Sequence, residues 1–383
     1  MIRNVKLKKL LVDGVFPVFS AMNMLIKKDD GTIFIYCAND KLIDNSEELF
    51  HHLIHNGYNK KYRIICGVGN PDEYASMVTN NVLFVPKRKC VLQYMRSAHV
   101  FYSHGKIPIK PTSKQCVINM WHGIPLKRIG KLANINNGNE FFFTYVCASA
   151  EMFRPIMAQA FGCPEENVCI CGEQKQDRLF EQKEERKYKY IVWTPTFRQS
   201  AYLGYDDSTD STLLPPLTDD EWDELNEVLS RNNVKMLAKL HPMQNLHGFD
   251  HVSKSHLQVM SDRYFREQGK NLYSELAQSD ALISDFSSVY LEYLVINRPI
   301  CFAMSDMSEY SETRGFVFEK PKDFMPGHFA ETKEQLFGFI KDIADGRDPY
   351  KDKRESVRDL VHQYKDDKSC ERVLKLSGVI IDS

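Results

Sequence analysis

The chain has 383 residues, of which 43% are hydrophobic and 26% charged, as in a soluble globular protein large enough for two domains. Its 50 basic and 51 acidic side chains leave a formal charge of -1, which excludes a nucleic-acid-binding protein that relies on bulk positive charge. The ten cysteines lack metal-ligand and redox spacing, so we expect a reducing compartment and no metal site.

The first 28 residues carry six basic side chains around an apolar stretch from residue 10 to residue 26. Asp13, Gly14 and Pro17 interrupt this stretch, which makes it unsuitable as a signal peptide or a membrane span. We therefore expect residues 1–30 to form a basic, amphipathic segment that lies on an anionic membrane surface. A first helix that packs on the domain is the alternative interpretation.

From residue 32 onward, short apolar runs alternate with helical patterns. The predicted strands are residues 32–37, 62–68, 82–85, 96–102, 116–121, 145–148 and 167–170, and a helix is predicted at 47–55. This alternation favours a parallel sheet with crossover helices. The charge-dense stretch at residues 181–189 is typical of a linker, so we assign residues 31–186 to a first domain.

The same pattern restarts after the linker. Strands are predicted at residues 190–193, 234–240, 281–284 and 300–303, and helices at 219–230, 272–279 and 289–296. The sequence therefore predicts an α/β fold with two Rossmann-type domains, residues 31–186 and 187–383, that face a central cleft. Because ligands bind beyond the carboxyl ends of parallel strands, polar residues that follow a strand are the candidates for function.

The first candidate is His122, which follows a predicted strand within residues 121–127, Trp-His-Gly-Ile-Pro-Leu-Lys. An imidazole can remove a proton from a hydroxyl near neutral pH. Lys127 and Arg128 supply positive charge nearby, which suits the acceptor side of a transfer reaction. The alternative is a histidine that bonds only the backbone of its turn.

The second candidate is His241, in the sequence Lys-Leu-His-Pro at residues 239–242. The proline ends the strand and leaves the histidine exposed at its tip. A histidine that is cationic or donates a hydrogen bond could stabilise a pyrophosphate as charge grows on its leaving oxygen.

The third candidate group follows the predicted strand at residues 281–284. Ser287 and Ser288 stand before a helix, where hydroxyls and unpaired backbone amides can bind an anion, although a serine cap explains them equally well. Glu292 lies one turn further on, where it could hold ribose hydroxyls or interact with the helix dipole.

Thr196 and Arg198 follow the first strand of the second half, and Arg314 follows its last predicted strand region. Arginine binds phosphate through a planar fork, so the two arginines could flank a diphosphate. Either arginine could instead form a surface ion pair.

Taken together, these motifs resemble the CDP-glycerol glycerophosphotransferase family, which contains teichoic-acid primases and polymerases and capsule-building relatives. The resemblance extends over roughly residues 32 to 376. It rests on Asp44-Asn45, Ser97-Ala98-His99, residues 121–127, 172–180, 194–198, 239–242 and 285–288, Asn297-Arg298-Pro299, Arg314-Gly315-Phe316 and Pro326-Gly327. The chain departs from the usual family pattern at Tyr102-Ser103-His104, Phe286 and Glu292.

The resemblance implies a GT-B-like fold without an essential metal or cofactor, on the cytoplasmic face of the cell membrane. It implies that His122 is the acceptor-side base and that His241, Ser287, Ser288 and Arg314 bind the donor phosphates, with Thr196 and Arg198 nearby. The expected donor is CDP-glycerol or CDP-ribitol, and the expected acceptor is a lipid-linked or polymeric hydroxyl. Two alternatives stay open, namely a GT-B glycosyltransferase that uses a nucleotide sugar, and a catalytically silent scaffold.

Overall fold

The computed structural model describes residues 14, 16–133, 141–196, 199–200, 205–206, 212–244, 246, 248–304 and 315–381. Its contacts divide the chain into two compact units. The first unit comprises Met1–His122, Ile129–Asp177 and Asp366–Ser383, and the second comprises Gly123–Arg128 and Arg178–Lys365. This division differs from the predicted one, because residues 178–186 belong to the second unit and residues 366–381 return to the first.

The first unit is built on a seven-stranded, fully parallel sheet in the order β3-β2-β1-β4-β5-β6-β7. Its strands are β1 (Asp29–Tyr36), β2 (Arg63–Val68), β3 (Val82–Pro86), β4 (Ser97–Tyr102), β5 (Cys116–Asn119), β6 (Tyr145–Ala148) and β7 (Val168–Ile170). The strand order reverses between β1 and β4, so crossover connections leave this point in opposite directions.

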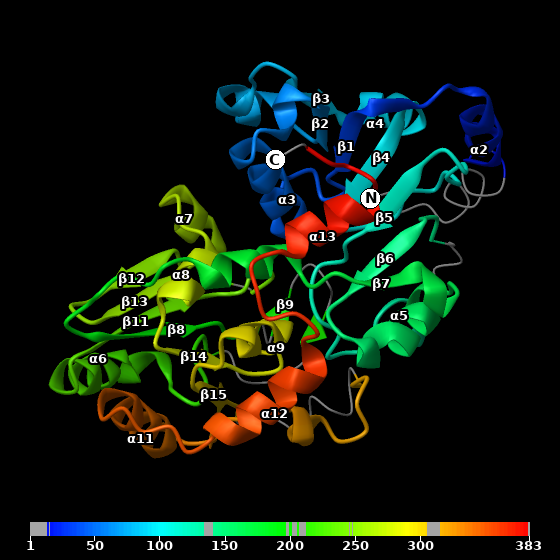
Figure 1. Ribbon diagram of the computed structural model, residues 1–383. Coiled ribbons are helices and arrows are strands. Elements are labelled where there is room, and N and C mark those ends of the chain that lie inside the picture. Colours follow the sequence, from blue (N-terminus) through cyan, green and yellow to red (C-terminus); the bar gives the residue numbers. More distant parts are fainter. Residues whose placement is uncertain are drawn as a thin grey trace. The chain divides into compact units, whose positions relative to one another are not determined.

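Helices cover both faces of this sheet (Figure 1). They are α2 (Phe16–Leu25), α3 (Asp44–His55), α4 (Lys87–Arg96), α5 (Arg154–Phe161) and α13 (Ser369–Leu376). On one face, Leu49 of α3 and Val373 of α13 share a core with the sheet, and on the other face Tyr94 of α4 fills a second core. Burial on both faces explains why these strands are near-continuous apolar runs.

The second unit repeats this architecture. Its sheet has the order β12-β13-β11-β8-β14-β15-β16 and is parallel except for the β12–β13 pair. The strands are β8 (Lys189–Trp193), β11 (Val234–Lys239), β12 (His251–Ser253), β13 (Leu257–Met260), β14 (Ala281–Ser284), β15 (Ile300–Ala303) and β16 (His328–Ala330). The order reverses between β8 and β14. The predicted α/β fold with two Rossmann-type parallel sheets is confirmed.

The predicted helices of the second unit correspond to α6 (Trp222–Arg231), α8 (Leu272–Gln278) and α9 (Ser288–Tyr293). The sequence did not predict α7 (Asp262–Glu267), α11 (Lys333–Ala344) and α12 (Lys351–Val361). Leu225 of α6 and Leu336 of α11 belong to the main core of this unit. A short two-stranded ribbon, β9 (Gln199–Ser200) and β10 (Tyr205–Asp206), completes the described strands.

Helix α13 is the last helix of the described chain but belongs to the first unit, where it packs beside α3 (Figure 1). Its first amides are held by Asp177, whose carboxylate accepts the N–H groups of Ser369 and Cys370, both at 2.9 Å. A carboxylate at this position accepts hydrogen bonds from two amides that have no partner within the helix, and its negative charge interacts favourably with the helix dipole. Asp177 thus fixes the segment that carries it to α13.

Substitution of Asp177 with alanine should lower the free energy of unfolding by about 1–2 kcal/mol, because two helix amides lose their acceptor. Amide hydrogen exchange of residues 369–376 should accelerate more than that of β1. Asp367→Ala is the matched control, since Asp367 is exposed beside the same helix end. Equal exchange rates in the two variants would contradict the role of Asp177.

Candidate functional site

In the first unit, the segments that follow β1, β4 and β5 bring Asp44, the first residue of α3, together with His104 and His122. The carboxylate of Asp44 contacts His104, with Oδ2 and Nε2 3.1 Å apart. The rings of His104 and His122 are stacked, with centroids 4.4 Å apart and planes inclined by 10°. These loops stand at the carboxyl ends of the strands beside the reversal in strand order, which is where α/β sheets bind ligands.

The backbone of Trp121 and His122 is held in place by two buried polar side chains. Asn45 donates to the carbonyl of Trp121 at 3.1 Å, and the Lys175 ammonium donates to the carbonyl of His122 at 2.9 Å. Trp121 itself has a φ of 60°, a left-handed conformation that is unfavourable for a bulky residue. A strained residue persists only where its surroundings enforce it, and such sites are often functional.

The hydrogen bonds of His122 determine which of its nitrogens carries the proton. Its Nδ1 lies 3.3 Å from the carbonyl oxygen of Ser103, which can only accept, so Nδ1 donates and Nε2 is left bare. Burial, with help from His104 and Lys175, lowers the pKa of His122 to about 4. At neutral pH the ring is therefore uncharged and presents Nε2 as a proton acceptor.

In the second unit, a second group of candidates lies at the reversal between β8 and β14. Thr196, after β8, donates its N–H and its hydroxyl to Oδ2 of Asp285, at 2.9 and 2.8 Å. Ser287, after β14, caps α9 by accepting the N–H of Val289 at 3.4 Å. The serine-cap interpretation of Ser287 is thus realised, and its predicted contact with phosphate stays a prediction.

Gly123 packs tightly against two predicted donor residues of the same unit. A Cβ atom at Gly123 would lie 2.7 Å from Oε1 of Glu292 and 3.0 Å from the hydroxyl of Ser288. Glu292 is fully buried and accepts a hydrogen bond from the Tyr273 hydroxyl. The glycine after His122 is therefore required for space.

His241 follows β11 and holds its proton on the opposite nitrogen from His122. Its Nδ1 accepts the N–H of Met243 at 3.1 Å, so the proton of the neutral ring is on Nε2. Burial and the nearby ammonium groups of Lys239 and Lys127 lower the pKa of His241 to about 4. Of the two predicted forms, the neutral hydrogen-bond donor is the one that this site favours.

Lys127 and Arg128 lie in the second unit rather than with His122. Residues 126–128 pair with residues 315–317, through bonds from Arg128 N–H to the Gly315 carbonyl at 3.3 Å and from Val317 N–H to the Leu126 carbonyl at 3.0 Å. Their predicted acceptor role stays a prediction. The predicted phosphate ligands Arg198 and Arg314 lie outside the described residues.

Sequence reasoning gave no role to three residues of the first cluster, namely Asp44, His104 and Lys175. Asp44 and His104 each follow a predicted strand, which is the same feature that identified His122. Knowledge of the strand order would have placed them together, because β1, β4 and β5 are consecutive in the sheet.

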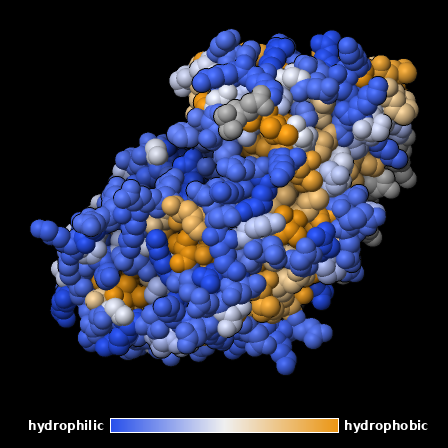
Figure 2. Space-filling view, viewed as in Figure 1, coloured by the Kyte–Doolittle hydropathy of each residue, from blue (hydrophilic) through white to orange (hydrophobic). Residues whose placement is uncertain are grey.

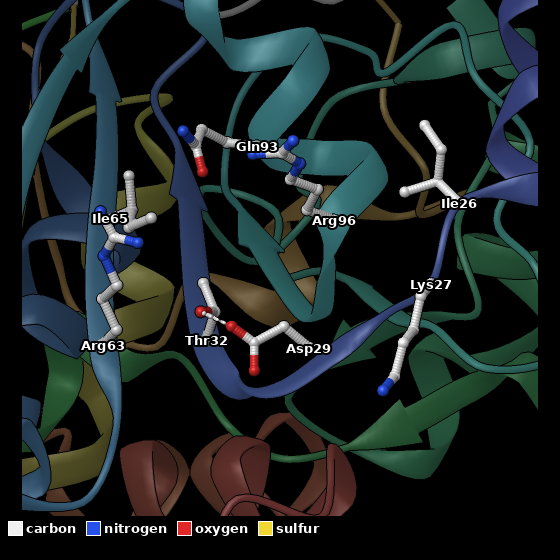
Figure 3. A pocket seen from close by; sticks show the side chains of 8 residues that line it. All are labelled: Ile26, Lys27, Asp29, Thr32, Arg63, Ile65, Gln93 and Arg96. Atoms are coloured by element: carbon white, nitrogen blue, oxygen red, sulfur yellow. Dashed lines mark hydrogen bonds between the residues drawn. The ribbon is translucent and has the colours of Figure 1, made fainter.

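A separate cavity of about 520 Å³ lies at the amino ends of β1 and β2. His122 lies at the opposite, carboxyl end of the strands. Figure 3 shows Arg63 and Arg96 on either side of the hydrogen-bonded pair Asp29 and Thr32. The lining residues are Ile26, Lys27, Asp29, Thr32, Arg63, Ile65, Gln93 and Arg96. The cavity is thus distinct from both clusters of candidate residues.

The lowered pKa values of His122 and His241 predict that the protein loses stability in mild acid. In the unfolded chain these imidazoles bind protons below about pH 6.5, whereas in the folded protein they bind them only near pH 4. The free energy of unfolding should therefore fall as the pH drops from about 6.5 to about 4. Allowing for partial exposure, the loss by pH 4.5 should exceed that of the His122→Asn, His241→Asn double variant by roughly 2 kcal/mol.

Urea denaturation between pH 7.5 and 4.5 measures this difference. Above pH 7, where imidazoles are uncharged in both states, the two proteins should show the same pH dependence. Parallel curves over the whole range would show that these rings titrate alike in the folded and unfolded chains.

Comparisons with known proteins agree with the family predicted from the motifs. A family model described as CDP-Glycerol:Poly(glycerophosphate) glycerophosphotransferase matches residues 18–377. The chain is 26% identical over 376 residues to the teichoic acid ribitol-phosphate polymerase TarL of Staphylococcus aureus, covering 91% of this chain and 62% of that protein. It is 22% identical to the teichoic acid glycerol-phosphate transferase of S. aureus, covering 91% and 92% of the two chains.

The fold is similar to that of a solved structure, the wall teichoic acid polymerase TagF, with a TM-score of 0.73 and 19% identity over 97% of this chain and 95% of that one. The chain spans between 44% and 62% of the length of three ribitol-phosphate polymerases that it matches. Because the family model extends over nearly all of the described residues, the chain belongs to the CDP-glycerol:poly(glycerophosphate) glycerophosphotransferase family.

Proposed function

We propose that this protein transfers a polyol phosphate, with glycerol phosphate as the first choice, from a CDP-activated donor to a hydroxyl of a teichoic-acid or capsule polymer. The observation that carries this proposal is the pair of neutral histidines with opposite tautomers. His122 presents a bare Nε2 that can take a proton, and His241 keeps a proton on Nε2 that it can donate. A transfer between two oxygen atoms requires both functions.

In the proposed reaction, the acceptor hydroxyl gives its proton to Nε2 of His122. Its oxygen then forms a bond to the donor phosphorus that carries the polyol, and the bond from this phosphorus to the CMP phosphate oxygen breaks. His241 donates a hydrogen bond as negative charge grows on the departing CMP. Phosphoryl transfer depends mainly on positioning and charge neutralisation, so no covalent intermediate is needed.

We assign the acceptor to the first unit and the CDP donor to the second. Thr196, Ser287, Ser288 and Glu292 are the described residues proposed to bind the donor, with Arg198 and Arg314 as further phosphate ligands. Within the described residues, no three acidic, histidine or cysteine side chains are grouped as metal ligands would be. A reaction without a metal or cofactor stays a prediction.

The decisive experiment offers the pure protein CDP-glycerol, CDP-ribitol and a panel of nucleotide sugars, together with a lipid-linked acceptor. CMP should appear only with a CDP-polyol. His122→Asn should lower the rate about 100-fold or more while donor affinity changes little, because the base acts only in the chemical step. His55→Asn, which changes an exposed histidine of the same unit, is the control.

Other outcomes would overturn the proposal in distinct ways. Release of a nucleoside diphosphate from a nucleotide sugar would identify a glycosyltransferase instead. No turnover of any donor would identify a scaffold without catalytic activity. Full activity of His122→Asn would remove this residue from the role of base.

We also propose that the N-terminal segment holds the protein on the cytoplasmic face of the membrane. Residues 1–13 lie outside the described residues, and within the described part no helix is long and apolar enough to cross a membrane. Helix α2 is anchored by Asn23, which donates to Gln115 at 2.7 Å. Figure 2 shows hydrophobic atoms at the upper right, where Figure 1 draws α2, and its side chains Val18, Met22, Met24 and Leu25 are exposed.

The variant Met24→Gln, Leu25→Gln should weaken binding to anionic phospholipid vesicles severalfold, because it removes the two most exposed apolar side chains of α2, which are 72% and 88% exposed. Unlike a deletion, it retains Asn23 and Lys28, which are buried. Leu360→Gln, at a residue that is 57% exposed in the second unit, is the matched control. Vesicle sedimentation measures binding, and equal losses in both variants would refute a specific role of α2.

A further inference from the structure

Two other rings of the first unit contact the ring of His122. His104 stacks on it with centroids 4.4 Å apart, and Trp121 contacts it with centroids 3.8 Å apart at a 40° inclination. Trp121 in turn packs edge-on against Phe161 of α5, with centroids 4.8 Å apart. A ring confined in this way cannot rotate freely about its Cβ–Cγ bond.

His104 is itself fixed by Asp44. The carboxylate can only accept, so Nε2 of His104 donates across the 3.1 Å contact. Side chains of both residues are mostly buried, with 18% of His104 and 33% of Asp44 exposed. Asp44 also lies 3.9 Å from the ammonium of Lys175, the group that donates to the backbone carbonyl of His122.

We propose that Asp44 and His104 are positioning residues for His122. The ring of His104, oriented by Asp44, keeps the plane of His122 fixed so that Nδ1 stays on the Ser103 carbonyl and Nε2 stays bare. This inference rests on the proposed function of His122 as the base. It extends that function to Asp44, which stands in one of the motifs but had no assigned role, and to His104, where the chain departs from the usual family pattern.

The charges around this ring system determine what Asp44 adds beyond geometry. Asp44, His104 and Lys175 are the charged or titratable groups that act on His122. Glu173 accepts a hydrogen bond from Nδ2 of Asn45 at 2.7 Å. Burial alone would raise the pKa of Asp44, but Lys175 and the hydrogen bond from His104 outweigh it and lower that pKa. Asp44 therefore remains a carboxylate, and its negative charge stabilises the positive charge that His122 acquires when it takes a proton.

Three variants separate the contributions of ring and charge. His104→Ala removes the stacked ring, His104→Phe keeps a flat ring without the bond to Asp44, and Asp44→Asn keeps an acceptor for His104 without the negative charge. The first readout is 15N NMR of the His122 ring, which distinguishes a protonated nitrogen from a bare one. The second is the steady-state rate with the CDP-polyol that the wild-type protein uses, and His55→Ala is the control.

We expect one His122 tautomer, protonated at Nδ1, in the wild-type protein and in His104→Phe, and a mixture of tautomers in His104→Ala. His104→Ala should lower kcat about tenfold with KM for the donor within about twofold. His104→Phe should recover only part of that loss, because a phenyl ring can stack on His122 but Asp44 cannot orient it. Asp44→Asn should lower the pKa of His122, because the negative charge that stabilises the protonated ring is lost.

A single tautomer and unchanged kcat in His104→Ala would overturn the proposal. Equal losses in His104→Ala and His104→Phe would overturn the positioning role of the stacked ring. Failure of the underlying function has a different signature, because full activity of His122→Asn would remove the base while leaving the tautomer comparison interpretable. Matching unfolding midpoints of the His104 variants are required before rates are compared.

Discussion

The candidate chemistry depends on one constraint, the reversal of strand order beside the first strand of each sheet. At such a reversal the connections on either side leave in opposite directions and open a crevice at the carboxyl ends of the strands. In the first unit Asp44 and His104 follow the two strands that flank the reversal, and in the second unit Thr196 and Asp285 do the same. The same topological position thus holds a hydrogen-bonded pair of polar side chains in both units.

The two histidines differ in chemistry because different backbone groups hold them. A carbonyl oxygen meets Nδ1 of His122, whereas an amide N–H meets Nδ1 of His241. Burial keeps both rings uncharged by lowering both pKa values to about 4. Two identical side chains can therefore supply a base and a hydrogen-bond donor at the same pH, and neither role needs a charged ring.

Much of the fold and part of the site follow from local sequence patterns. Short apolar runs identified most strands of both sheets, and residues at strand ends identified His122 and His241. The partnership of Asp44, His104 and His122 did not follow, because it depends on strand order, which no local pattern encodes. Helix α4 was missed because it opens with Lys87, Arg88 and Lys89, and its buried residues, Cys90, Tyr94 and Met95, appear only afterwards.

The return of α13 to the first unit has a consequence for how the protein is made. A ribosome synthesises residues 178–365, the main part of the second unit, before it reaches α13. Until then the surface beside α3 lacks Cys370, Val373 and Leu374, which belong to its core, and Asp177 lacks the amides that it caps. The first unit to emerge is therefore the last to be completed, so its sheet must remain soluble with an uncovered apolar face during translation.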